Sequence, residues 1–138
     1  MTEMILSDIE KVHIVNRWIS SFASGVSEEI LKEHVFEDYN FLWHIFSWGN
    51  VSCLEGDKAR KAFDERKCDL VYMFCSGYSS NNFPQIEDVM ITNKVTSEQL
   101  EMKDDIYIVD MNFSWTYVHT HDSECGPYFA MSNNTISN

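Results

Sequence analysis

Two segments near the C-terminus decide the fold: DIYIVD at residues 105–110 and FSWTYVHTHD at residues 113–122. Both are rich in β-branched and aromatic residues, and the residues between them supply short polar turn chemistry. They therefore predict an antiparallel hairpin. Side chains two positions apart lie on one face of a strand, so the second segment is expected to carry a stripe of aromatic rings and imidazoles. The stripe comprises Phe113, Trp115, Tyr117, His119 and His121.

Helices are predicted before this hairpin. Ser7 and Glu10 have the spacing of a capping box, in which each side chain bonds the backbone of the other residue. Apolar residues at near-helical spacing follow and predict the core-facing side of a helix that ends near Gly25. They are Ile5, Ile9, Val12, Trp18, Ile19 and Phe22. Further helices are predicted from Ser27, at residues 55–67 and from a second capping box at residues 96–99.

The remaining strands are read from apolar runs. Residues 41–48 are almost all large and apolar, which predicts a central strand covered on both faces. Strands are also expected at residues 70–75 and 89–92, separated by a polar loop at residues 77–84. Gly126-Pro127 interrupts the chain before a last apolar run at residues 128–130.

This order of elements predicts the fold class α+β. We expect a mostly antiparallel or mixed sheet of about five strands, with N-terminal helices packed on one side. Doubly wound α/β folds are excluded because regular alternation of strands and helices is missing. The 138 residues fit one domain, predicted to span residues 1–131, followed by a polar tail at residues 132–138.

Charge limits the class of partner. Ten Lys and Arg stand against twenty-two Asp and Glu, which gives a formal net charge of −12. Such an excess repels phosphate backbones and anionic lipid surfaces, so we expect neither nucleic acid nor a membrane as a partner. A basic protein is the expected class of partner, although solubility alone also favours acidic composition. From residue 95 onward, acidic residues outnumber the single cation, Lys103, and mark an acidic pole.

The cellular compartment is predicted from the sequence of residues 1–5, the lengths of the apolar runs and the spacing of the cysteines. Residues 1–5 lack a cationic start followed by an apolar region, and no run approaches the about 18 apolar residues of a membrane span. The four cysteines are dispersed and form no Cys-x-x-Cys pair. Reduced thiols in the cytoplasm are therefore expected.

Several short strings occur together in this order: LWHIFS at 42–47, CLEG at 53–56, DIYIVD at 105–110, FSWTYVHTH at 113–121 and CGPYF at 125–129. With them the chain resembles the bacterial family known as domain of unknown function 4275, from about Trp18 to Phe129. The resemblance implies a small bacterial cytoplasmic protein and carries no catalytic residues. The chain departs from the family pattern at Asp122, where glutamate is expected to be frequent. A weaker architectural resemblance is to immunity proteins of bacterial toxin systems.

The candidate site lies at the end of the hairpin. His119 and His121, two apart on a strand, have a usable geometry for metal ligands, and Asp122, Glu124 or Cys125 could complete such a site. Cys125 could alternatively act as a nucleophile with one of the histidines as base. The plainer interpretation is that these residues satisfy local hydrogen bonds. No cofactor is predicted.

Two classes of function remain. The favoured one is a non-enzymatic binding protein, of which a toxin-neutralising immunity protein is one form, that uses its acidic surface against a cationic partner. Its predicted binding residues are Trp115, His119, His121, Asp122 and Glu124. The alternative is a metal-dependent or thiol enzyme that uses residues 119–125, with His119, His121 and Cys125 as metal ligands.

Overall fold

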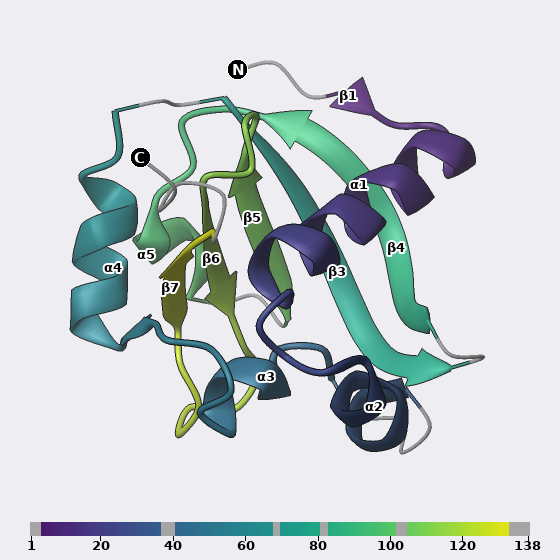
Figure 1. Cartoon of the computed structure of the whole chain (residues 1–138). Helices are drawn as coiled ribbons and strands as arrows, with labels where there is room; N and C mark the ends of the chain where they lie inside the picture. Colours follow the sequence, from purple (N-terminus) through teal and green to yellow (C-terminus); the bar gives the residue numbers. More distant parts are fainter. Residues whose placement is uncertain (1–3, 37–40, 68–69, 81–82, 102–104, 133–138) are drawn as a thin grey trace.

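A computed structural model of the chain describes residues 4–36, 41–67, 70–80, 83–101 and 105–132, with the backbone alone for residues 36, 76–80 and 83–87. Its centre is an antiparallel sheet of seven strands in the order β1-β4-β3-β5-β6-β7-β2 (Figure 1). The strands are β1 (Met4–Ile5), β2 (Leu54–Glu55), β3 (Val71–Ser80), β4 (Phe83–Thr92), β5 (Ile106–Asp110), β6 (Trp115–His119) and β7 (Tyr128–Met131). The helices are α1 (Asp8–Phe22), α2 (Glu28–Ile30), the π-helical η1 (Leu31–Phe36), α3 (His44–Ser47), α4 (Asp57–Asp64) and α5 (Ser97–Leu100).

The predicted C-terminal hairpin is confirmed, and it forms the middle of the sheet. Ile106 of β5 pairs with His119 of β6, and Val109 pairs with Thr116. At the turn, the Asp110 carboxylate accepts from the backbone N–H of Ser114 at 2.6 Å. This bond ties the two strands together at a buried turn.

The predicted stripe on β6 is shorter than expected. Phe113 has a positive φ of 56° and lies in the turn, and its ring belongs to a different hydrophobic cluster from Tyr117. His121 lies two residues beyond the end of the strand. Only Trp115, Tyr117 and His119 keep the alternation of β6, because the period of two holds only while the backbone is extended.

Helices cover both faces of the sheet. On one face, α1 crosses the strands diagonally (Figure 1), and its Trp18 lies in a cluster with Tyr107 and Val109. On the other face, Phe63 of α4 and Leu100 of α5 pack with Ile106, Ile108 and Tyr117, with the Phe63 and Tyr117 rings stacked at 4.3 Å. Every residue of β5 is buried as a result. The N-terminal helix packs on one face as expected, but α4 and α5 were not expected to cover the other.

The capping box at α1 is confirmed, whereas part of its predicted core face is wrong. The Ser7 hydroxyl accepts from the Glu10 N–H, and the Glu10 carboxylate accepts from the Ser7 N–H. The helix buries Trp18 and Phe22, but Ile9 and Val12 are 86% and 45% exposed. At 3.6 residues per turn, Ile9 lies on the side of α1 opposite the buried Trp18, so its side chain faces away from the sheet.

Trp18 anchors α1 to the sheet through a polar contact. Its indole Nε1 donates to the hydroxyl of Thr116 at 2.8 Å, and this hydroxyl donates to the carbonyl of Ile108 at 2.6 Å. All three groups are buried, so the chain of bonds satisfies polar atoms that water cannot reach.

Two predicted elements are wrong. Residues 41–48 are not a strand, since they form turns and the short helix α3. An apolar run of eight cannot be distinguished by period from a buried helical turn, and Leu42, Ile45 and Phe46 are fully or almost fully buried. Within the predicted loop at residues 77–84, the described residues 77–80 and 83–84 belong to β3 and β4, which pair through Ser79 and Pro84. The sheet gains its extra strands at β1, β2 and β7.

The predicted domain limits stay a prediction. Ser132 is buried and its N–H donates to the carbonyl of Ser114 at 2.9 Å. The rest of the predicted tail, residues 133–138, lies outside the described residues.

Candidate functional site

A pocket of about 340 Å³ opens where β6 ends, and we call it the β6–β7 pocket. Its floor is the connection between β6 and β7, and its wall comes from α4 and from the residue after α5. It is lined by Arg60, Glu101, His119, Thr120, His121, Asp122, Ser123, Cys125, Gly126 and Pro127. The pocket therefore brings together four predicted residues: His119, His121, Asp122 and Cys125.

The connection at residues 120–127 is held by its own side chains. The Thr120 hydroxyl contacts the carbonyls of Asp122, at 2.9 Å, and Cys125. The Asp122 carboxylate accepts from the N–H of Glu124 at 2.9 Å. These local bonds agree with the plainer interpretation of the Thr-His-Asp sequence, and they fix the shape of the pocket rim.

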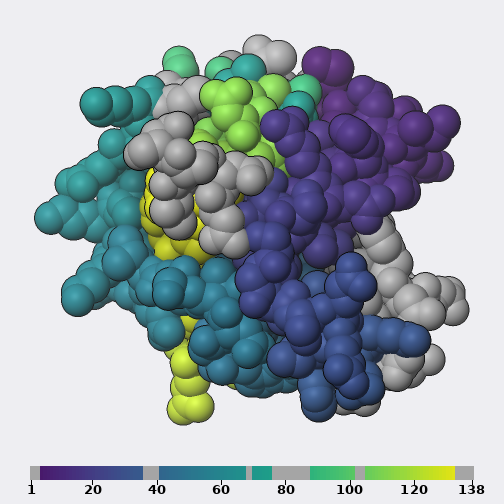
Figure 2. All heavy atoms as spheres, viewed as in Figure 1, coloured from purple at the N-terminus to yellow at the C-terminus, as the bar shows by residue number. Residues whose placement is uncertain are grey.

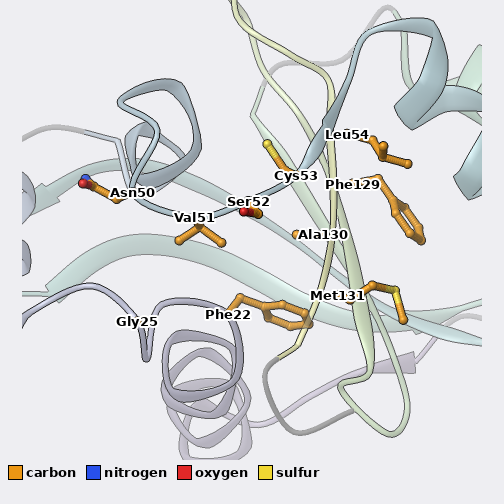
Figure 3. A pocket seen from close by; sticks show the side chains of 10 residues that line it. All are labelled: Phe22, Gly25, Asn50, Val51, Ser52, Cys53, Leu54, Phe129, Ala130 and Met131. Atoms are coloured by element: carbon orange, nitrogen blue, oxygen red, sulfur yellow. The ribbon is translucent and has the colours of Figure 1, made fainter. Parts of the chain in front are cut away.

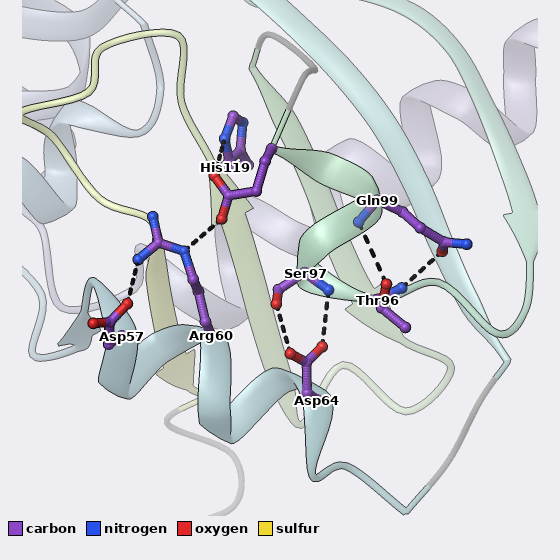
Figure 4. A network of polar contacts seen from close by, with 8 residues as sticks. Asp57, Arg60, Asp64, Thr96, Ser97, Gln99 and His119 are labelled. Atoms are coloured by element: carbon purple, nitrogen blue, oxygen red, sulfur yellow. Dashed lines mark hydrogen bonds and ion pairs between the residues drawn. The ribbon is translucent and has the colours of Figure 1, made fainter.

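One wall of the pocket is a chain of charged contacts (Figure 4). The Arg60 guanidinium donates to Glu101 Oε1 at 2.6 Å and to Asp57 Oδ1 at 2.8 Å. The other oxygen of Glu101 lies 3.7 Å from Nε2 of His119, whose side chain is 9% exposed. Arg60 is therefore shared by two carboxylates, and His119 faces one of them.

The position of Glu101 depends on the short helix α5. Ser97 donates through its N–H and its hydroxyl to the two oxygens of Asp64, at 2.8 and 2.5 Å, which fastens α5 to α4 (Figure 4). The predicted capping box of Thr96 and Gln99 is confirmed. These bonds fix the position of α5. Glu101, the residue that follows the helix, is therefore placed at the pocket.

His121 lies on the opposite wall and bonds to a buried carboxylate. Its Nδ1 lies 3.0 Å from each oxygen of Asp105, and its backbone N–H donates to Oδ1 at 3.1 Å. The indole Nε1 of Trp43 donates to the same oxygen at 2.8 Å. Asp105 is 7% exposed, whereas the His121 side chain is 45% exposed. The carboxylate fixes the ring at Nδ1 and leaves Nε2 on the outer side.

A row of rings continues from His121 away from the pocket, and we call it the aromatic band: Phe41, Trp43, His44, Trp48 and His121. His44 stacks on Trp48 at 4.7 Å and contacts Trp43 at 4.2 Å, and Trp43 lies 6.0 Å from His121. Burial and the nearby charge of His121 lower the pKa of His44, against the smaller opposing effect of Asp105 and Asp122. His44 bonds to the Ser47 hydroxyl at 2.8 Å.

The two predicted histidine ligands have separate carboxylate partners. His119 faces Glu101, and His121 is bonded to Asp105. Within the described part of the chain, no group of three or more His, Cys, Asp or Glu is arranged to hold a metal ion. The predicted metal site at His119, His121 and Cys125 gains no support from this geometry.

Two partly buried thiols have raised pKa values: Cys125, which lines the β6–β7 pocket, and Cys53, which does not. Burial, followed by the charge of Asp122, raises the pKa of Cys125, and Tyr128 opposes this by a hydrogen bond. Burial and Glu55 raise the pKa of Cys53 to about 11. A catalytic thiol requires the opposite shift, because the thiolate is the nucleophile.

Two predicted binding residues lie outside the pocket lining. Trp115 lies on the sheet face covered by α4, where its ring stacks on Phe129 at 5.5 Å and contacts Phe63 at 5.9 Å. Glu124 is exposed on the β6–β7 connection. Trp115 is only partly buried, and Trp48, at 45% exposed, is the more accessible tryptophan.

The acidic pole is smaller at the surface than the sequence suggested. Asp105 and Asp110 are 7% and 6% exposed and bond to neighbouring donors. Glu98, Glu101, Asp122 and Glu124 remain at or near the surface. The basic segment of α4 is also partly used internally, since Arg66 donates to the carbonyls of Phe63 and Val95.

Sequence reasoning did not find Arg60, Glu101 or Asp105 as site residues. Arg60 and Glu101 are 41 positions apart, and no local pattern links them. Asp105 bonds to Trp43 and His121, 62 and 16 positions away, so no local pattern marks it either.

A second cavity, of about 650 Å³, lies between the end of α1, the segment 50–54 and β7 (Figure 3). It is lined by Phe22, Val51, Cys53, Leu54, Ala130 and Met131, among others. This lining is mostly apolar and holds no carboxylate or imidazole. Of the titratable residues of the predicted site, His119, His121, Asp122 and Cys125 line the β6–β7 pocket, and none lines this second cavity.

Comparison with known proteins gives one match. The family described as Domain of unknown function (DUF4275) matches residues 4–129. No curated protein matches the chain, and no solved structure does. Among the described residues, no helix has the length and apolar character needed to cross a membrane. The match covers nearly the whole sequence and agrees with the resemblance found in the five short strings, so the chain belongs to the DUF4275 family.

Proposed function

We propose that the chain is a non-enzymatic protein-binding domain whose β6–β7 pocket and aromatic band bind a basic protein. The observation that carries the proposal is the state of the pocket's charged groups. Its one lining cation, Arg60, is already paired with Asp57 and Glu101, so Asp122 and the neighbouring Glu124 add negative charge without a cation of their own among the contacts described. A cationic side chain from a partner would balance the negative charge of Asp122 and Glu124.

Carboxylates hold both pocket histidines in place. Each imidazole has a carboxylate partner, and Asp105 is satisfied by the Trp43 indole as well as by His121. Such bonds rigidify the pocket wall. The Cys125 thiol beside them has a raised pKa, which disfavours the thiolate.

Trp48 supplies the anchor of the proposed interface. It is 45% exposed, and His44 stacks parallel to it with an interplanar angle of 9°. A preformed tryptophan face is a common hot spot of protein interfaces, and it also attracts Arg or Lys through its π-system. The lowered pKa of His44 keeps this ring neutral near pH 7, so no positive charge opposes a cationic group on Trp48.

The biological form of the proposal is an immunity-type protein of the bacterial cytoplasm that neutralises a basic toxin. The net charge of −12 supports this form, since opposite charges steer encounter and suppress wrong partners. The family match itself assigns no activity.

The test starts with a pull-down from the native host and continues with measured affinities for the partner so identified. Trp48→Ala is expected to weaken binding at least about tenfold, as for a hot spot. Leu54→Ala is the matched control, because Leu54 is 42% exposed but lines the other cavity. Equal affinity of wild type and Trp48→Ala would reject the aromatic band as the interface.

A second candidate is favoured by one observation, the bond between exposed His121 and buried Asp105. A carboxylate that fixes Nδ1 of an accessible imidazole is the arrangement used to orient a general base. This supports an enzyme acting through residues 119–125. Elemental analysis separates its metal-dependent form: stoichiometric zinc or iron in the purified protein would favour it over binding. An enzymatic activity of the purified protein that is lost in His121→Ala would favour a metal-free enzyme.

A further inference from the structure

The edge strand β2 pairs with only part of β7. Leu54, the first residue of β2, lies opposite Phe129 of β7. In the same register, the position opposite Met131 would belong to Ser52. Ser52 lies outside β2, so Met131, the last residue of β7, has no strand partner on this side among the described residues. The sheet therefore has an open position at its β2 edge.

The backbone N–H and C=O of Met131 point to this open position. On the β6 side, the N–H of the next residue, Ser132, donates to the carbonyl of Ser114 at 2.9 Å. Backbone bonds of successive residues in an antiparallel strand point to opposite sides, so those of Met131 point away from β6. Pro127, four residues earlier, agrees with this alternation, since its carbonyl accepts from the N–H of Gly56 on the β2 side at 2.9 Å. No described residue forms a hydrogen bond with either backbone group of Met131.

An apolar cavity lies at the open position, and we call it the β2–β7 groove. It is the cavity of about 650 Å³ in Figure 3, and Ser52 and Met131 both line it. Its walls include Phe22 and Phe129, and two of its apolar side chains, Leu54 and Met131, are 42% and 53% exposed. None of its lining residues is Asp, Glu, Lys, Arg or His. Figure 2 shows atoms of β7 (yellow) reaching the surface beside the blue-green segment that leads to β2.

We propose that the β2–β7 groove binds a short extended peptide segment with uncharged, apolar side chains. One residue of the peptide takes the position opposite Met131 and exchanges two backbone hydrogen bonds with it, while the apolar walls receive its side chains. The free N–H and C=O favour a peptide backbone as the occupant. The uncharged lining excludes a charged side chain, whose burial without a partner is costly. The groove shares no lining residue with the β6–β7 pocket, so this site is independent of the proposed function.

Peptide titration of the full chain, followed by proton–nitrogen NMR, tests the groove. The probes are acetyl-Val-Leu-Val-amide and acetyl-Val-Phe-Val-amide, and we expect the largest shifts at the backbone amides of Met131 and Leu54. The matched probes carry a methyl group on the central peptide nitrogen, so they keep the apolar side chains but lack the donor for the Met131 carbonyl. They should bind at least about fivefold more weakly. Acetyl-Val-Lys-Val-amide should bind at least about tenfold more weakly, because the groove offers its charge no partner.

Two variants locate the site. Met131→Glu places a charge in the groove at an exposed side chain, so it should keep the fold and weaken binding of the apolar probes at least about tenfold. Leu54→Glu should act in the same direction. Ile9→Glu is the matched control, because Ile9 is 86% exposed and lies outside the groove, and it should bind as wild type does.

Three results would overturn the proposal. The first is the absence of shifts at Met131 and Leu54 with both apolar probes. The second is equal affinity for a probe and its methylated form, which would show that backbone pairing plays no part. The third is a dimer of the free chain that Met131→Glu dissociates in sedimentation, which would assign the open position to a second copy.

Discussion

His121 bonds to Asp105 through both its ring and its backbone. Nδ1 lies 3.0 Å from each carboxylate oxygen, and the N–H of the same residue donates to Oδ1 at 3.1 Å. Asp105 precedes β5 and His121 follows β6, so this carboxylate closes the end of the central hairpin. The contact joins the fold to the candidate site, because the same bond orients an exposed imidazole over the pocket.

Replacing the carboxylate should therefore cost stability. Asp105→Asn removes the charge and leaves a buried polar group whose NH₂ faces donors from Trp43 and His121. We expect the free energy of unfolding to fall by about 2 kcal/mol. Urea denaturation measures this. Asp88→Asn, at an exposed position on β4, is the control and should change stability by less than about 0.5 kcal/mol. Equal stabilities of the two variants would contradict the closing role of Asp105.

The buried bond between Trp18 and Thr116 gives a second prediction. Thr116→Val keeps the shape of the side chain but leaves the indole N–H of Trp18 and the Ile108 carbonyl without this hydroxyl. An unsatisfied buried donor costs about 1–3 kcal/mol, so we expect a loss of about 2 kcal/mol in thermal or urea unfolding. Thr116→Ser keeps the hydroxyl and should lose less than Thr116→Val. The reverse order would show that methyl packing, and not the bond, holds α1 on the sheet.

The lowered pKa of His44 predicts acid sensitivity. Because burial disfavours the charged ring, the unfolded chain holds more protons than the folded chain once the pH falls below the usual histidine pKa. Stability should therefore fall as the pH is lowered from about 7.5 to about 5.5. His44→Gln removes the titrating group and should flatten this slope. Unfolding measured at several pH values checks it, and an unchanged slope in His44→Gln would show that other groups cause the dependence.

The raised pKa of Cys125 predicts a slow thiol at neutral pH. Burial and Asp122 keep the thiol protonated, so alkylation by iodoacetamide at pH 7 should be slower than for an unperturbed cysteine peptide. The rate should rise as the pH is raised toward about 9, because more thiolate is present. Peptide mass spectrometry gives the rate for each cysteine. Faster labelling of Cys125 than of the peptide at pH 7 would revive the thiol-enzyme alternative.

The sequence predicted the elements that depend on local chemistry. The β5–β6 hairpin and the capping boxes at Ser7 and Thr96 are confirmed because turn residues and cap spacing act over a few positions. The strand predicted at residues 41–48 was wrong because an apolar run fits a strand and a buried helical turn equally well. Ile9 and Val12 were misplaced because their spacing from Trp18 does not match whole helical turns, so they lie away from the face that α1 buries.

The candidate site was predicted only in part for a similar reason. Residues 119–123 and Cys125 do line the pocket, since they are close together in the chain. Arg60 and Asp105 reach it only through strand order and helix packing, which one sequence does not encode in a local pattern. The acidic pole was overestimated because Asp105 and Asp110 have internal partners.

The most direct test of the proposed function is the affinity for the basic partner as a function of salt. Titration calorimetry between about 50 and about 500 mM salt should show binding that weakens at least about tenfold, because screening removes the attraction of the partly exposed Asp122 and the exposed Glu124. The aromatic contacts of Trp48 should persist. Affinity that stays constant over this range would contradict an acidic binding surface.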